Sequence, residues 1–365
     1  MSGTSDEAKI GDLARRLIDA PAGSDTAPDP VRLLYGLSEP PPFPADNIFP
    51  LTWEVETPRL MELYDKGRDP GWAPNRLPWD TLDPAAFSAD QRYAMAYWFA
   101  LLSVFDSSGP AVFARAMIHT YETHEEDPIR KCFFLVTRDE VNHEEVCQLA
   151  ITKLTPGGPF GYVPETPLGK LAQNNARWYH HNGARYWEGF KKGIHKHPLP
   201  ILFTSFLMGE VASSTLFHGM FKATTIPVFR ECFRRVGQDE ARHMSICLTV
   251  LGKLLPKLTD EQRAMITKQI RAGYVFLSGI LYEPPDLFWE LPETWRPAHK
   301  LLEQTAREAG LGILSDAARR DNWRTAFLKL KGVLEPHGIV FPAIPEIGID
   351  GETVAFDPDD IVPVF

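Results

Sequence analysis

The chain has 365 residues, 44% of them hydrophobic and 24% charged, with a net charge of −10 at pH 7 and four cysteines. This composition is that of an ordinary soluble protein; its acidic balance argues against nucleic acid or an anionic membrane as a partner, and so few cysteines make no disulfide framework. Without a signal-peptide pattern or an apolar run of roughly 18 residues, the sequence predicts a cytoplasmic protein with no membrane span.

The proline-rich residues 1–87 predict an N-terminal arm packed on the rest of the chain, with short helices at 6–19 and 57–67. Ser88 and Gln91 form a capping-box pattern, which starts a helix-compatible stretch of about 35 residues. Long helices are then expected at 127–156, 167–192, 199–222, 227–256 and 259–281. Because the turns are short and no strand pattern alternates, residues 88–335 predict an all-α helix bundle. The proline-rich residues 336–365 predict a tail on its surface.

A duplication is visible when the chain is laid over itself at a shift of 100 residues. Residues 130–156 and 230–256 are identical at eleven of 27 positions. Both copies centre on Asp-Glu-x-x-His, so the two helices carry the same chemical face. The repeat therefore indicates where the chemistry of this protein takes place.

Each copy holds a glutamate and a histidine three residues apart, Glu140 with His143 and Glu240 with His243. That offset puts both side chains on one face of a helix, about one turn apart, where they can bind one cation together. A single pair of this kind is weak evidence, because surface pairs are common. Two copies inside a repeat predict a metal site between two helices.

Such a site needs one carboxylate from each of two further helices, and the geometry of antiparallel hairpins locates them. Residues equidistant from a tight turn lie level, so Glu210 lies level with Glu240, in an apolar run where a carboxylate must pair or bind metal. By the same count Asp106 lies level with Glu140, whereas Glu122 is too close to the turn. A proline four residues after Asp106 removes a helical hydrogen bond, and a distortion there would help to aim the short side chain.

The predicted ligands are thus four carboxylates and two imidazoles: Asp106, Glu140, His143, Glu210, Glu240 and His243. This mixture suits iron or manganese, and the absence of thiolates from it disfavours a structural zinc site.

Other polar residues near the motifs are candidates for supporting roles. Asp139 and Asp239 can accept the second ring N–H of a ligand histidine across the bundle, with Arg242 orienting one of them. A solvated helix edge is the alternative for these aspartates. Ser213 and Ser214 lie one turn beyond Glu210, where a hydroxyl could relay a proton; packing of small residues between helices explains the two serines equally well.

With these residues the segment 88–256 resembles the ferritin-like di-iron carboxylate superfamily. That group includes bacterial multicomponent monooxygenases, acyl-carrier-protein desaturases, ribonucleotide reductase small subunits and p-aminobenzoate N-oxygenases. The segment 106–111 (DSSGPA) is similar to the first-ligand segment of the N-oxygenases, and 127–131 (DPIRK) to their following turn. The resemblance implies a ferritin-like four-helix bundle with additional helices and the same six ligands.

Three positions depart from the patterns of these families. Val236 stands where the N-oxygenases carry an additional ligand histidine. Asp106 replaces their usual glutamate, as in ribonucleotide reductase small subunits. Cys147 occupies the position of the radical tyrosine of those subunits, which argues against a generator of tyrosyl radicals.

We therefore expect a di-iron enzyme, with manganese as an alternative at one site, that activates O2 to oxidise a small organic substrate in an apolar pocket beside Glu210. N-oxygenation of an amine ranks above hydroxylation or desaturation. Because neither a dinucleotide fingerprint nor an iron–sulfur cysteine cluster occurs, electrons are expected from a separate reductase or ferredoxin, unless the enzyme consumes peroxide. A homodimer is compatible with the sequence. A ferroxidase or iron-storage protein is the rival from another class, and the length of the chain argues against it.

Overall fold

The computed structural model describes residues 55–123, 125–193, 199–281 and 289–355, together with Asp12 and Arg15. Residues 51–365 form one compact unit and residues 1–50 form a second. Apart from Asp12 and Arg15, the helix expected at 6–19 lies outside the described residues.

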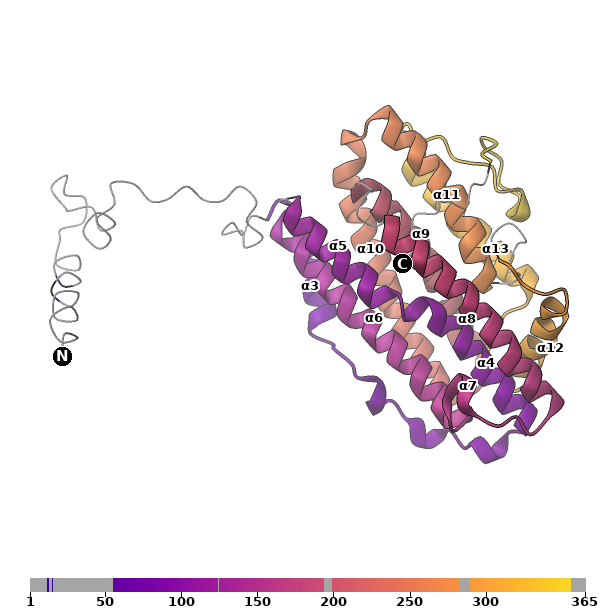
Figure 1. Cartoon of the computed structure of the whole chain (residues 1–365). Helices are drawn as coiled ribbons and strands as arrows, with labels where there is room; N and C mark the ends of the chain where they lie inside the picture. The colour runs from indigo at the N-terminus through magenta and orange to yellow at the C-terminus, as the bar shows by residue number, and fades with distance from the viewer. Residues whose placement is uncertain are drawn as a thin grey trace, which may run out of the picture. The chain divides into compact units, whose positions relative to one another are not determined.

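The core of the larger unit is a bundle of two helical hairpins (Figure 1). The first hairpin joins α4 (Ala89–Asp106) and α5 (Gly109–Glu122) to α6 (Asp127–Leu154), and the second joins α9 (Leu199–Ala223) to α10 (Pro227–Leu254). α4 and α5 pack along α6, α9 packs along α10, and α6 contacts α10. In the described residues the only β-structure is two isolated bridges near 342–352. The predicted all-α class is confirmed.

Local sequence signals set the starts of these helices. The Ser88 hydroxyl accepts from the Gln91 amide while the Gln91 side chain accepts from the Ser88 amide, which is the predicted capping box. Pro110, Pro128 and Pro227 stand in the first turns of α5, α6 and α10, where a missing N–H costs no helical hydrogen bond.

The helix-compatible stretch after Ser88 is divided into α4 and α5 at Ser107 and Ser108. Pro110 has no N–H to donate to the carbonyl of Asp106. One residue earlier in α4, the carbonyl of Phe105 accepts from the Ser108 hydroxyl at 2.8 Å. The expected distortion is therefore a full break, and Asp106 is the last residue of α4.

Further helices surround the bundle. α3 (Pro58–Arg68) packs on α6 and α10, while α8 (Pro167–Gly193) and α12 (Trp295–Glu308) pack on α4. α11 (Asp260–Leu281) and α13 (Asp316–Leu334) pack on α9. Shorter elements join these helices: Pro74–Arg76, Trp79–Thr81, Pro84–Ala86, α7 (Gly158–Gly161), Leu255–Lys257, Glu335–His337 and Pro345–Ile347. The expected helices at 57–67, 167–192, 199–222 and 259–281 are present, whereas α12 and α13 were not anticipated.

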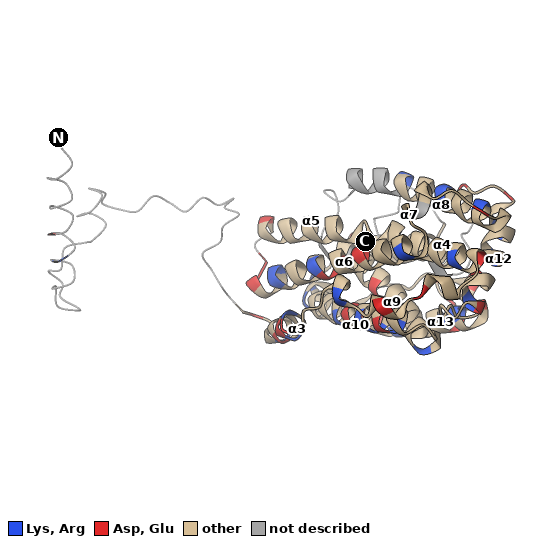
Figure 2. Ribbon diagram, turned by 90° about the horizontal axis from the view of Figure 1, so that it is seen from below, with Lys and Arg blue, Asp and Glu red and all other residues tan. Residues whose placement is uncertain are grey.

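Charged residues of both signs are interspersed on the surface of the larger unit, as Figure 2 shows for α3. By contrast, α9 is apolar on nearly all sides because other helices surround it; Phe203, Phe206 and Met208 are fully buried. In the described part of the chain, no helix combines the length and the apolar character that crossing a membrane requires.

Candidate metal centre

Four buried side chains from three helices converge between the two hairpins. One ligand atom from each of Glu140, Glu210, Glu240 and His243 lies within 4.8 Å of the others. None of these residues is more than 3% exposed. Since buried charges in proteins are paired or coordinate a metal, this group can hold a cation.

Both motif glutamates face both motif histidines. The Nδ1 of His143 lies 3.7 Å from Glu140 Oε2 and 3.4 Å from Glu240 Oε1. The Nδ1 of His243 lies 3.3 Å from Glu140 Oε1 and 3.7 Å from Glu240 Oε2. On its other side, His243 Nδ1 is 3.2 Å from Glu210 Oε2. Each motif glutamate thus presents one oxygen to each imidazole, which is how a carboxylate can be shared by two cations.

The outer nitrogens of the two imidazoles reach aspartates on the opposite helix. His143 Nε2 lies 3.4 Å from Asp239 Oδ2, and His243 Nε2 lies 3.3 Å from Asp139 Oδ2. Arg242 Nη2 donates to both aspartates, at 2.6 Å in each case. Asp139 is 0% and Asp239 4% exposed, so the alternative of a solvated helix edge is wrong. The expected contacts are present, and Arg242 orients both aspartates rather than one.

Sequence reasoning missed several groups that hold these aspartates. The indole of Trp72 donates to Asp239 Oδ2 at 2.8 Å, and its ring stacks on His143 with centroids 6.5 Å apart. Arg138 Nη2 donates to Asp139 Oδ1 at 2.6 Å. Trp72 stands far from the motif in the chain and gives no local signal. Arg138, the neighbour of Asp139 within the repeat, could have been noticed.

Asp106 lies at the side of the cluster where His143 is. The Cys147 thiol, one turn beyond His143 on α6, donates to Asp106 Oδ2 at 3.0 Å. Although the residue is partly exposed, burial of its carboxyl raises the pKa of Asp106 to about 7, against the opposing effects of the His143 charge and the Cys147 thiol. Glu122 is half exposed at the end of α5, 3.4 Å from His119. Of the two candidates for a first-helix carboxylate, only Asp106 is near the cluster.

At the break between α4 and α5, the backbone of Gly109 comes close to the Glu140 side chain. A Cβ atom added to Gly109, the first residue of α5, would collide with the Glu140 carboxylate. A side chain at position 109 would therefore have to displace the Glu140 carboxylate.

The buried carboxylates of the cluster favour the protonated, positively charged form of the two histidines. Burial alone would lower the pKa of both histidines, but hydrogen bonds and charges of the surrounding carboxylates hold the pKa of His143 and of His243 well above its ordinary value. Burial would raise the pKa of Glu140, yet the two histidines bring it down to about 2. Burial and the neighbouring charge of Glu210 instead hold the pKa of Glu240 well above its usual range. The two histidine charges therefore stabilise the ionised form of Glu140, whereas Glu240, next to Glu210, is more easily protonated.

The atoms at the centre have the character of metal ligands. Nδ1 of His143, Nδ1 of His243 and both carboxylate oxygens of Glu210 are buried and make no aligned hydrogen bond to any described residue. When Nε2–H is donated to an aspartate, the imidazole turns a lone pair at Nδ1 towards the carboxylates. Lone pair and anion repel each other unless a proton or a metal ion lies between them. With Asp106, the four carboxylates balance the charge of two divalent ions, so the residues suit iron or manganese.

The two serines have different surroundings. Ser213 donates to the carbonyl of Gly209 at 3.0 Å, so its proton is engaged within α9. Ser214 is half-buried and lines a cavity between α9, α10 and α13. The relay role of both serines stays a prediction, and the backbone hydrogen bond weighs against it for Ser213.

Of the comparisons with known proteins, the one with solved structures identifies the fold. No protein-family model matches the chain, and no curated protein is similar enough in sequence to match. Among solved structures, the chain is similar to an R2-like ligand-binding oxidase with an aerobically reconstituted Mn/Fe cofactor. For one point mutant the TM-score is 0.55 at 15% identity, covering 78% of this chain and 99% of that one. For a long-soak structure of the oxidase it is 0.53 at 14% identity, covering 78% and 94%. The fold is ferritin-like, of the R2-like type.

Proposed function

We propose that this protein is a di-metal oxidase that holds two iron or manganese ions and uses O2 to oxidise a small organic substrate. The observation that carries the proposal is the pair of inward-facing Nδ1 atoms with Glu140 and Glu240 between them. The structurally similar oxidase, whose cofactor is Mn/Fe, supports this class of chemistry. Two redox-active ions in such a site would supply electrons to O2.

The residues of the chain would divide the work by position. Glu140 and Glu240 would help to hold the metal at the centre of the cluster, and His143 and Asp106 would complete one metal position. His243 and Glu210 would complete the other. Asp139, Asp239 and Arg242 would fix the ring orientations and the tautomer of the histidines, which raises their basicity as ligands.

For the substrate we propose N-oxygenation of an amine, with C–H hydroxylation or desaturation as the alternative. The similarity of segments 106–111 and 127–131 to N-oxygenases supports the first. Val236 favours the second, because it is 2% exposed and apolar where those enzymes have an additional ligand histidine. We further propose that a separate reductase or ferredoxin supplies the electrons.

Metal analysis tests the proposed site directly. Protein loaded anaerobically with iron(II) should hold about two equivalents per chain. His143→Ala and His243→Ala should each lose at least one. Full occupancy in both variants would rule out the proposed ligand arrangement.

The first-helix ligand has a matched control. Asp106→Ala should lose metal and oxygen uptake, whereas Glu122→Ala, at the exposed end of α5, should behave as the unchanged protein. The reverse result would place the ligand at Glu122. Uptake of iron far beyond two equivalents, with no oxidised amine or hydrocarbon formed, would instead indicate a ferroxidase.

A further inference from the structure

Aromatic rings from three helices form a column where α8 and α12 pack on α4. The ring of Trp295 lies within 14° of parallel to that of Tyr179 and within 12° of parallel to that of His299, with centroids 6.0 Å and 4.7 Å away. Tyr179 also meets the edge of Phe105 at 6.3 Å. Since Phe105 directly precedes the predicted ligand Asp106, the column extends from the neighbour of that ligand to His299.

His299, at the end of the column, is hydrogen-bonded to a second tyrosine. Its Nδ1 lies 2.8 Å from the Tyr97 hydroxyl, and its Nε2 lies 3.6 Å from Glu303 Oε2. The other oxygen of Glu303 accepts from Arg307 and Arg319, which hold this carboxylate in place. With Nε2–H turned towards the carboxylate, the lone pair at Nδ1 accepts from the Tyr97 hydroxyl. The three residues thus form a proton donor, an acceptor and a group that orients the acceptor.

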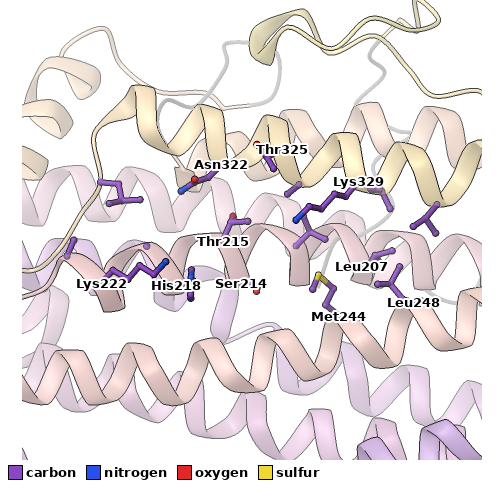
Figure 3. Close-up of a pocket in the computed structure, with 17 residues that line it drawn as sticks. Leu207, Ser214, Thr215, His218, Lys222, Met244, Leu248, Asn322, Thr325 and Lys329 are labelled. Atoms are coloured by element: carbon purple, nitrogen blue, oxygen red, sulfur yellow. The ribbon is translucent and has the colours of Figure 1, made fainter.

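These three side chains are too buried to act on a substrate directly. None of Tyr97, His299 and Glu303 is more than 4% exposed. The cavity between α9, α10 and α13, shown in Figure 3, is lined by none of them. An electron can move between buried, stacked rings where no substrate can enter. The arrangement therefore fits one-electron chemistry of the tyrosine better than acid–base catalysis.

The two tyrosines of this region differ in where their phenolic proton could go. Tyr179 is fully buried, and its hydroxyl has no hydrogen-bond partner among the described residues. A phenol that loses an electron becomes a strong acid, so its oxidation is favoured where a base can take the proton. Burial, assisted by the charge of Arg319, lowers the pKa of His299 to about 3, so its ring is neutral and can accept. The oxidised phenol is a far stronger acid than this imidazolium. Oxidation is therefore favoured at Tyr97 over Tyr179.

We propose that Tyr97 and His299 form a redox-active pair that takes up an oxidising equivalent from the aromatic column. One electron passes from Tyr97 to the oxidised indole of Trp295, which is thereby reduced. The phenolic O–H bond breaks, and its proton forms a new N–H bond at His299 Nδ1. The products are a neutral tyrosyl radical and an imidazolium that faces the Glu303 carboxylate.

The indole must first have lost an electron to a strong one-electron oxidant, the class to which a redox-active metal centre that has reacted with O2 belongs. The pair is distinct from a radical tyrosine at position 147, where this chain has a cysteine. The inference rests on the ring column and its hydrogen bonds, so it holds whether or not the buried cluster binds metal.

A tethered photo-oxidant tests the pair in the full chain. Trp178→Cys removes an exposed indole next to Tyr179 and provides an exposed thiol, whereas all four native cysteines are buried. A ruthenium tris-bipyridine label on this thiol becomes a one-electron oxidant after a flash in the presence of an electron acceptor. A neutral tyrosyl radical should then appear in freeze-quenched EPR spectra, and it should form more slowly in D2O because the O–H bond breaks. Absence of the radical, or equal rates in H2O and D2O, would overturn the proposal.

Variants of the labelled protein locate the radical. Tyr97→Phe keeps the ring and its packing and should abolish the signal, whereas Tyr179→Phe, the matched change within the column, should retain it. His299→Gln still offers the phenol a hydrogen-bond acceptor but no base, so the signal should also be lost. A full signal in Tyr97→Phe, or its loss in Tyr179→Phe alone, would refute the location. A full signal in His299→Gln would refute the role of the imidazole as proton acceptor.

Discussion

Gly109 shows how a single residue without a side chain can shape a ligand cluster. It stands where the chain leaves α4 and enters α5, with its backbone against Glu140. The carboxylate that both histidines face thus lies close to the backbone at the start of α5. Any side chain at position 109 competes with Glu140 for the same volume.

Gly109→Ala should therefore displace Glu140 and lower the metal content below about two equivalents per chain, while the helix itself gains up to about 1 kcal/mol of propensity. Metal analysis together with a thermal melt separates these effects. Gly252→Ala on α10 is the control, because no atom lies within 4 Å of the added methyl group. Unchanged metal content in Gly109→Ala would show that Glu140 can move aside without loss of the site.

His299 makes a pH-dependent contribution to stability away from the cluster. It is buried against Trp295 and lies 2.8 Å from the Tyr97 hydroxyl. Burial, assisted by the charge of Arg319, lowers the pKa of His299 from 6.5 to about 3. As the pH falls below 6.5, the unfolded chain takes up a proton at this residue that the folded chain does not.

The free energy of unfolding should fall between pH 7 and pH 5 by about 2 kcal/mol more in the unchanged protein than in His299→Gln. Urea unfolding of both proteins at the two pH values measures this difference. Parallel losses in the two proteins would mean that His299 is protonated in the folded state.

At the scale of single residues, the sequence reveals those site residues that belong to a short motif or to one hairpin. The Glu-x-x-His pairs and their preceding aspartates repeat along the chain, so they are visible without a structure. Glu210 could be found by counting along a hairpin, because a tight turn fixes the register of two antiparallel helices. Trp72 could not, since its bond to Asp239 spans 167 residues and depends on how α3 and the chain after it pack.

The hairpins are tied to each other by charge across α6 and α10. Arg242 of α10 is only 12% exposed in its side chain and bonds one aspartate on each helix. Two carboxylates so close together would repel each other without it. The Arg242 guanidinium favours the ionised form of both aspartates, which then accept from the Nε2–H groups of the two histidines.

Arg242→Met keeps most of the aliphatic stem and removes the charge, so it should destabilise the metal-free protein by about 3–5 kcal/mol, as is usual when a buried ion pair loses one partner. Arg235→Met on the same helix loses the more exposed ion pair with Glu231 and should cost at most about 1 kcal/mol. Chemical denaturation measures both. Similar costs would show that Arg138 and Trp72 suffice to hold the two aspartates.

Element by element, long helices with strong apolar patterns and proline starts were predictable to within a few residues. The break after Asp106 was predictable as a distortion, because Pro110 marks it, but its extent depends on tertiary contacts such as the approach of Gly109 to Glu140. Helices α12 and α13 were missed since they are rich in charged residues and held by packing on α4 and α9.

At the scale of the whole molecule, two residues that are equivalent in the repeat, one in α6 and one in α10, bind the segment that precedes the bundle. Lys153 lies 5.8 Å above the ring of Trp79, while its counterpart Lys253 bonds Glu56 at 2.9 Å and Glu126 at 3.3 Å. The buried Glu126 carboxylate also accepts from the amide of Thr57 at 2.8 Å and from its hydroxyl at 2.6 Å. Residues 55–87 are thus part of the larger unit, a packing that proline content alone could only suggest.

Glu126→Ala should remove the acceptor of these donors, destabilise the protein by about 2–3 kcal/mol and speed hydrogen exchange in α3. Glu125→Ala is the neighbouring control, since it loses only a 3.6 Å ion pair with Lys253 and should cost at most about 1 kcal/mol. Exchange measured by mass spectrometry distinguishes the two. Unchanged protection of α3 in Glu126→Ala would mean that apolar packing alone holds that helix.

The reciprocal contacts between α6 and α10 obey the rule of a two-fold axis: residue i of one half touches residue j of the other, and j touches i. The axis is imperfect. Arg242 serves both aspartates while its counterpart Asn142 bonds the carbonyl of Trp72, and Asp106 on one side corresponds to Glu210 on the other. The two metal positions would have equal affinities only if the symmetry were complete. Because it is broken at Asn142 and Arg242 and at Asp106 and Glu210, we expect two unequal affinities, visible as two steps when metal-free protein is titrated.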